Sequence, residues 1–222
     1  MIVGERKPVG EIWGMIKGFR KVLVFGCNTC VAVCFAGGEK EVGILASQIR
    51  MKAKQENVDM LVIEGAIERQ CEHEFIAAAK DQIESADCVL SIACGAGIQF
   101  TGEDFPHKII LPGLNTTGIN VVEQNGVFAE RCQSCGDCVL HLTGGVCPIS
   151  RCSKSILNGP CGGSHDGKCE VNPEIPCGWQ LIYDRLKLQG RLEILDEVIP
   201  AKDWRPSRDG GPRKIIREDL QE

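Results

Sequence analysis

Residues 21–34 read KVLVFGCNTCVAVC, and this stretch decides the expected fold. Its first six residues are mostly apolar, which is typical of a strand that is buried on both faces of a parallel sheet. The next eight carry Cys27, Cys30 and Cys34 on one short loop. Apolar side chains near helical spacing follow over Glu39–Gln55. The sequence therefore predicts a strand, a cysteine loop and a helix.

This unit recurs through the first part of the chain. A short helix is expected from Pro8 to about Lys17, and a longer one over Glu72–Ser85. Further strands are predicted at Val58–Ile63, Cys88–Ala93, Lys108–Leu111 and, as a short fifth, Gly126–Phe128. Strands that alternate with helices favour an α/β fold. We therefore expect a doubly wound, flavodoxin- or Rossmann-like parallel sheet domain over residues 1–129.

The cysteines of this domain follow its strands. Because the carboxyl ends of parallel strands meet at one edge of a sheet, the thiols there should gather. The loop cysteines 27, 30 and 34 would supply three ligands of a [4Fe-4S] cluster. Cys94, after the third strand, is the preferred fourth ligand, with Cys71 in reserve. Structural zinc, or merely buried thiols, is the alternative, and Cys88 is expected to pack as a small hydrophobe.

A second domain is expected over residues 130–199, because the pattern changes to loops rich in Gly, Pro and Cys. Metal should replace a hydrophobic core there. Helices over Gly178–Gln189 and Arg191–Val198 would close it, and residues 200–222 would form an extended polar tail ordered only against a partner. Eight cysteines lie in this small, loop-rich, metal-stabilised domain: Cys132, Cys135, Cys138, Cys147, Cys152, Cys161, Cys169 and Cys177.

The first three of these cysteines have the spacing of bacterial ferredoxins, and Cys147-Pro148 repeats the Cys-Pro that closes such runs. Eight thiols suffice for two sets of four, but the spacing leaves their pairing open. Zinc is a stronger competitor at the wider spacings, where His165 could substitute as a ligand. We therefore expect two or three [4Fe-4S] clusters in the whole chain, with zinc as the alternative in one later site.

Composition excludes several classes of partner. The formal charge is −5 and no basic stripe is present, so nucleic acid is not expected to bind. No apolar run approaches the roughly 20 residues that span a bilayer, and no export signal is apparent, so we expect a cytoplasmic protein. A reducing compartment favours metal ligation over disulfides. Gly95-Ala96-Gly97 lacks the third glycine of a dinucleotide fingerprint, and no catalytic residues are predicted.

The sequence resembles a known family in several separate segments. In the second domain these are Cys132–Cys138, Thr143–Pro148, Asn158–Gly163, Cys169–Val171 and Pro176–Trp179. They resemble the cysteine-rich domain associated with methylenetetrahydrofolate reductase. In the first domain, Gly26–Cys30, Cys34–Gly38 and Ala93–Gly97 are similar to the accessory subunits of that enzyme in acetogens and other anaerobes, the MetV family. The resemblance extends from about residue 8 to 204.

The resemblance implies a function in one-carbon metabolism, in the Wood–Ljungdahl methyl branch. Subunits of this family accompany an FMN-containing, MetF-like methylenetetrahydrofolate reductase catalytic subunit and are thought to pass electrons to its flavin. The chain would then be a non-catalytic, iron–sulfur electron-transfer subunit of an oxidoreductase complex, with a further electron-donor subunit as a second partner. The alternative is a zinc-binding scaffold that only stabilises the same complex.

Overall fold

The computed structural model describes residues 1–221 and divides the chain into two compact units. We call Met1–Phe128 the amino-terminal unit and the chain from Ala129 onward the carboxyl-terminal unit.

A four-stranded parallel sheet forms the centre of the amino-terminal unit. Its strands are β2 (Lys21–Cys27), β3 (Leu61–Ile67), β4 (Cys88–Ser91) and β5 (Ile109–Pro112), in the spatial order β3-β2-β4-β5. Every neighbouring pair is parallel. The predicted α/β class with a parallel sheet is therefore confirmed.

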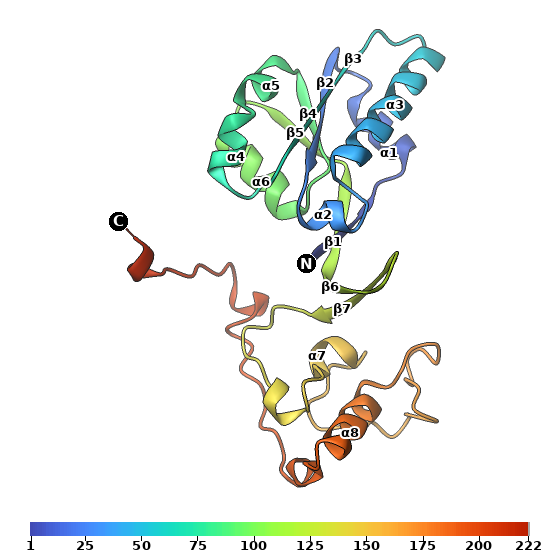
Figure 1. Ribbon diagram of the computed structural model, residues 1–222, viewed down its shortest axis with the longest axis vertical. Helices are drawn as coiled ribbons and strands as arrows, with labels where there is room; N and C mark the ends of the chain where they lie inside the picture. Colours follow the sequence, from blue (N-terminus) through green and yellow to red (C-terminus); the bar gives the residue numbers. More distant parts are fainter. Residues whose placement is uncertain (222) are drawn as a thin grey trace. The chain divides into compact units, whose positions relative to one another are not determined.

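Helices cover both faces of this sheet (Figure 1). Helices α1 (Val9–Ile16) and α3 (Glu39–Gln55) lie on one face, and α4 (His73–Ala78), α5 (Lys80–Ser85) and α6 (Gly95–Asp104) lie on the other. Alternation along β2 explains the two cores, because successive side chains of a strand point to opposite faces. Val22 and Val24 pack with α1 and α3, whereas Leu23 and Phe25 pack with α4 and α5.

A second, antiparallel sheet was not predicted. It contains β1 (Ile2–Arg6), β6 (Leu114–Gln124) and β7 (Val127–Cys132), in the order β1-β6-β7. The short fifth strand predicted at Gly126–Phe128 is present as the beginning of β7, but it belongs to this antiparallel sheet and not to the parallel one. Gly126, with φ +79°, lies in the turn between β6 and β7. A turn this short joins antiparallel strands only, since a parallel pair needs a crossover of a dozen or more residues.

Two predicted helices differ in detail. The helix expected over Glu72–Ser85 is interrupted at Ala79, whose N–H donates to Ile76 O (3.0 Å) in a tighter 3₁₀-type turn. The helix expected over Arg191–Val198 is a 3₁₀ helix over Leu192–Asp196.

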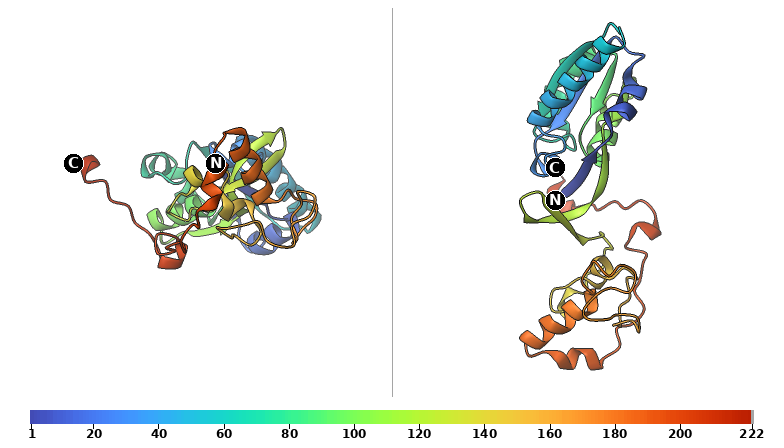
Figure 2. Two further views of the ribbon diagram at one scale, coloured as in Figure 1. Left: turned by 90° about the horizontal axis from the view of Figure 1, so that it is seen from below. Right: turned by 90° about the vertical axis from the view of Figure 1, so that its right-hand side faces the viewer.

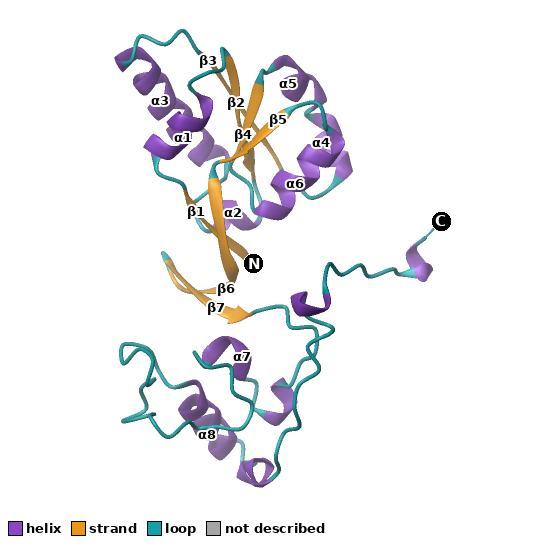
Figure 3. Ribbon diagram, turned by 180° about the vertical axis from the view of Figure 1, so that it is seen from behind, coloured by secondary structure: helices purple, strands orange, loops and turns teal. Residues whose placement is uncertain are grey.

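Loops dominate the carboxyl-terminal unit (Figures 2 and 3). Its α-helices are α7 (Pro148–Arg151) and α8 (Gly178–Leu188), and short 3₁₀ turns occur at Leu140–Leu142, Arg208–Gly210 and Glu218–Leu220. Its buried apolar cluster is small and centres on α8: Cys177, Trp179, Ile182 and Leu186. Within residues 1–221, no helix has the length and apolar character needed to cross a bilayer.

Candidate metal centres

Three cysteines lie at or beyond the carboxyl ends of the parallel strands. Cys27 is the last residue of β2, Cys71 follows β3, and Cys94 follows β4 and directly precedes α6. Burial raises the pKa of the Cys71 thiol, and the nearby Cys27, Cys94 and Glu72 side chains raise it further. We call Cys27, Cys71 and Cys94 the sheet-edge thiols. Cys94, the preferred fourth ligand, and Cys71, the reserve, thus lie in the same group.

Gln70 holds this edge of the sheet together. Its side chain is fully buried, and its Nε2 donates to Phe25 O (3.1 Å) and Gly26 O (3.0 Å) at the end of β2. Its Oε1 accepts from Ser91 Oγ (2.6 Å) at the end of β4. Gly97 permits α6 to approach, because a Cβ there would lie 2.9 Å from Gln70 Cβ. Gln70 therefore fixes the backbone that presents Cys71.

Replacing Gln70 with alanine should lower the free energy of unfolding by about 3 kcal/mol, because two buried carbonyls and a buried hydroxyl each lose one hydrogen bond. Chemical denaturation followed by circular dichroism measures this. Gln99→Ala is the matched control. Its exposed amide donates to Gly95 O within its own helix, so a change within about 0.5 kcal/mol is expected. Equal effects in the two variants would contradict a special role for Gln70.

The other two cysteines of the loop are Cys30 and Cys34. Cys30 begins the short helix α2 (Cys30–Val33) and is half-buried. Cys34 is buried, and its thiol donates to Val31 O (3.4 Å) and Gly4 O (3.7 Å), toward β1. The structure thus places five thiols on this side of the unit without placing Cys34 among the sheet-edge thiols.

A cavity of about 200 Å³ lies within the carboxyl-terminal unit. Four cysteines line it, Cys132, Cys135, Cys138 and Cys147, and we call it the Cys132 cavity. The loop around it also directs a backbone amide at sulfur, since Ser134 N–H donates to Cys132 Sγ (3.4 Å). Four thiols around one volume suit a four-iron cluster, because each iron takes a single thiolate and N–H groups bond to the sulfurs.

The remaining four cysteines lie near one another around α8, and we call Cys152, Cys161, Cys169 and Cys177 the Cys152 group. Cys152 packs against the buried cluster that contains Cys177. Cys169 Sγ lies 3.3 Å from the hydroxyl of Ser153, the residue after Cys152. Cys161 Sγ lies 3.4 Å from Glu170 Oε2, one residue beyond Cys169. Each of these four cysteines therefore lies beside another member of the group or beside the residue that follows another member in the sequence.

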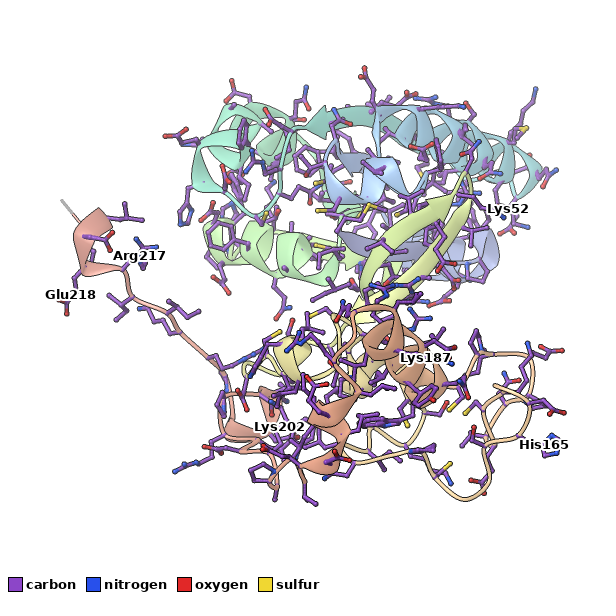
Figure 4. The ribbon with its side chains drawn as sticks, turned by 60° about the horizontal axis from the view of Figure 1, so that its bottom comes forward. Lys52, His165, Lys187, Lys202, Arg217 and Glu218 are labelled. Atoms are coloured by element: carbon purple, nitrogen blue, oxygen red, sulfur yellow. The ribbon has the colours of Figure 1, made fainter. Side chains whose placement is uncertain are left out.

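Local hydrogen bonds favour the thiolate form at one of them. The Ser153 hydroxyl, followed by the backbone N–H groups of Asn172 and Val171, lowers the pKa of Cys169. A thiolate is the form that binds metal. His165, weighed from the sequence as a zinc ligand, lies on the outer loop (Figure 4), where its side chain is 86% exposed and pairs with Asp166 (2.9 Å).

Cys88 is separate from all three groups. It is completely buried in the core beside β2, and burial raises its pKa to about 12. The expectation that it packs as a small hydrophobe is confirmed. Within residues 1–221, no three His, Cys, Asp or Glu side chains converge on one point in the way that ligands of a single ion do.

Residues that support the sites were missed by sequence reasoning. Gln70 could have been suspected, because it stands between the end of a predicted strand and Cys71. Lys202 carried no signal, since it lies 65 positions from its partner Asp137 and belongs to no recognisable motif.

Together, the parallel sheet with thiols at its edge and the cysteine-lined loops define the chain as an α/β protein with a cysteine-rich carboxyl-terminal unit. Comparison with protein families then relates part of it to a particular enzyme. Residues 111–205 match the family described as "Methylene-tetrahydrofolate reductase C terminal". This region holds all eight later cysteines. No curated protein and no solved structure matches the chain.

Proposed function

We propose that the chain is an iron–sulfur electron-transfer subunit. In this proposal it passes electrons to the FMN of a partner methylenetetrahydrofolate reductase catalytic subunit. The observation that carries the proposal is the Cys132 cavity, where four thiols surround one volume inside the region matched to the reductase family. Iron–sulfur clusters accept and release single electrons. A separate electron-donor subunit would supply those electrons.

We propose three ligand sets. The first would be the sheet-edge thiols with one further thiol from the same loop, either Cys30 or Cys34. The second would be the four cysteines of the Cys132 cavity, and the third the Cys152 group. The amino-terminal sheet would act as a doubly wound scaffold, since ligands of such sheets sit beyond the carboxyl ends of the strands. A reducing cytoplasm would keep all these thiols available.

A zinc-binding scaffold is the second candidate, and the small core of the carboxyl-terminal unit favours it. Only a few buried apolar side chains hold the loops around α8, so a metal there would stabilise the fold directly. Zinc in the Cys152 group is compatible with clusters at the other two sites. Zinc at every site would leave the protein without a redox role.

Metal analysis of the full chain, purified without oxygen, tests the proposal. We expect about eight to twelve irons per chain and a brown colour that bleaches with dithionite, because each cluster holds four irons. The reduced protein, mixed with an FMN-loaded catalytic subunit in a stopped-flow instrument, should bleach the flavin. The control omits the chain and contains dithionite at the residual concentration that the reduced protein carries into the mixture. A colourless, zinc-loaded protein would establish the scaffold instead, and an iron-loaded protein that never reduces the flavin would refute the proposed partner.

A further inference from the structure

The last part of the chain packs on the loop around the Cys132 cavity. Lys202, labelled in Figure 4, has a side chain that is only 1% exposed. Its Nζ donates to Asp137 O (2.5 Å) and lies 3.0 Å from Asp137 Oδ2. Its ammonium also lies 5.7 Å from the centre of the Trp204 ring. The expected tail therefore begins as a segment bound to its own unit.

Two further contacts attach this segment to the same loop. Arg213 Nη1 donates to Ser134 O (2.6 Å) and to Pro206 O (3.2 Å). Gly136 has φ +78°, and a Cβ there would lie 2.4 Å from Pro206 O. Glycine is thus required for the close approach as well as for the backbone conformation. We call residues 202–213 the strap.

The buried ammonium lies next to a cavity thiol. Cys135 Sγ donates to Asp137 O (3.6 Å), the same carbonyl oxygen that accepts from Lys202. A positive charge beside a group that gains an electron stabilises the reduced form. Because the Lys202 side chain is almost inaccessible to solvent, screening of its charge is weak.

We propose that Lys202 is a positioning and tuning residue for a cluster in the Cys132 cavity, held there by the strap, and that it raises the reduction potential of that cluster. This inference rests on the proposed function. Asp137 carries the opposite charge, but its side chain is 52% exposed, so solvent screens it more than Lys202. The two charges therefore oppose each other, with Lys202 the stronger.

A redox titration of the full chain, followed by electron paramagnetic resonance, tests this inference. Lys202→Met keeps the apolar stem and removes the charge. It should lower the equilibrium constant for reduction of the Cys132 cluster about tenfold, which is about 59 mV for a one-electron couple. Lys202→Arg should stay within about twofold of the natural protein. Asp137→Asn should shift the potential in the opposite direction, by less. Loss of a signal in Cys135→Ser assigns it to this cluster.

Lys187→Met is the matched control, because Lys187 is exposed on α8 and its loss changes net charge equally. It should leave the potential unchanged. Opposite shifts in Lys202→Met and Asp137→Asn support the inference, since a loosened loop would not reverse its effect with the sign of the charge. No shift, or shifts in the same direction, would overturn it. Should Lys202→Met fail to hold iron, Lys202→Gln removes the same charge, and the direction of its shift decides.

The failure of this inference is distinct from failure of the proposed function. If the natural protein contains the cluster and both variants leave its potential unchanged, only the role of Lys202 is refuted. If the natural protein contains no cluster, both the role of Lys202 and the proposed function are refuted.

Discussion

Replacing Cys135 with serine is expected to remove about four irons per chain, the content of one cluster. Cys135 lines the Cys132 cavity, and serine keeps the shape of the side chain but replaces the soft thiolate with a hydroxyl. The visible absorbance should fall in proportion. Iron and sulfide assays on anaerobically purified protein measure the loss. The sheet-edge thiols belong to the other unit, so the cluster that we propose there should remain.

Cys88→Ala is the matched control for this experiment. Cys88 is fully buried in the sheet core, and burial raises the pKa of its thiol far above the ordinary value. Its removal should therefore leave the iron content unchanged. An unchanged iron content in Cys135→Ser would show that the cavity holds no cluster. Equal losses in both variants would show that iron content follows general stability instead of ligation.

Replacing Gly37 with alanine should lower the free energy of unfolding by about 3 kcal/mol or more, the upper part of the range for overpacking. A Cβ at Gly37 would lie 1.8 Å from Ile92 O, a backbone atom that cannot rotate away. Gly37 O also accepts from Cys27 N (2.8 Å), so the displacement would reach the sheet-edge thiols. Thermal unfolding followed by circular dichroism measures the change, together with iron content.

Gly14→Ala provides the control with the same chemical change. Gly14 lies within α1 and is exposed, and a Cβ there meets no atom within 4 Å. Alanine is the better helix former, so this variant should gain up to about 1 kcal/mol. If Gly37→Ala proved as stable as Gly14→Ala, the cysteine loop would not pack as closely against the end of β4 as described.

Local pattern predicted much of the amino-terminal unit. The helix over Glu39–Gln55 was predicted with the bounds that the structure has, and the strand at Lys21–Gly26 differs from β2 by one residue. Both depend on periodicity within a single element. The antiparallel sheet was missed because β1 and β6 pair across more than a hundred residues, as Ile2 with Ile119. Periodicity within one element carries no information on such a partner.

The sequence by itself determined which thiols share a loop, because the covalent chain holds Cys132, Cys135 and Cys138 within a few residues of each other in any fold. Only the tertiary structure decided that Cys147 completes that cavity, that Gln70 presents Cys71 beside Cys27, and that Lys202 is buried on a loop far away in the chain. The physical reason is that the number of residues between two side chains limits their separation in space only when that number is small. For residues far apart in the chain, the packing and hydrogen bonding of whole elements determine which of them come into contact.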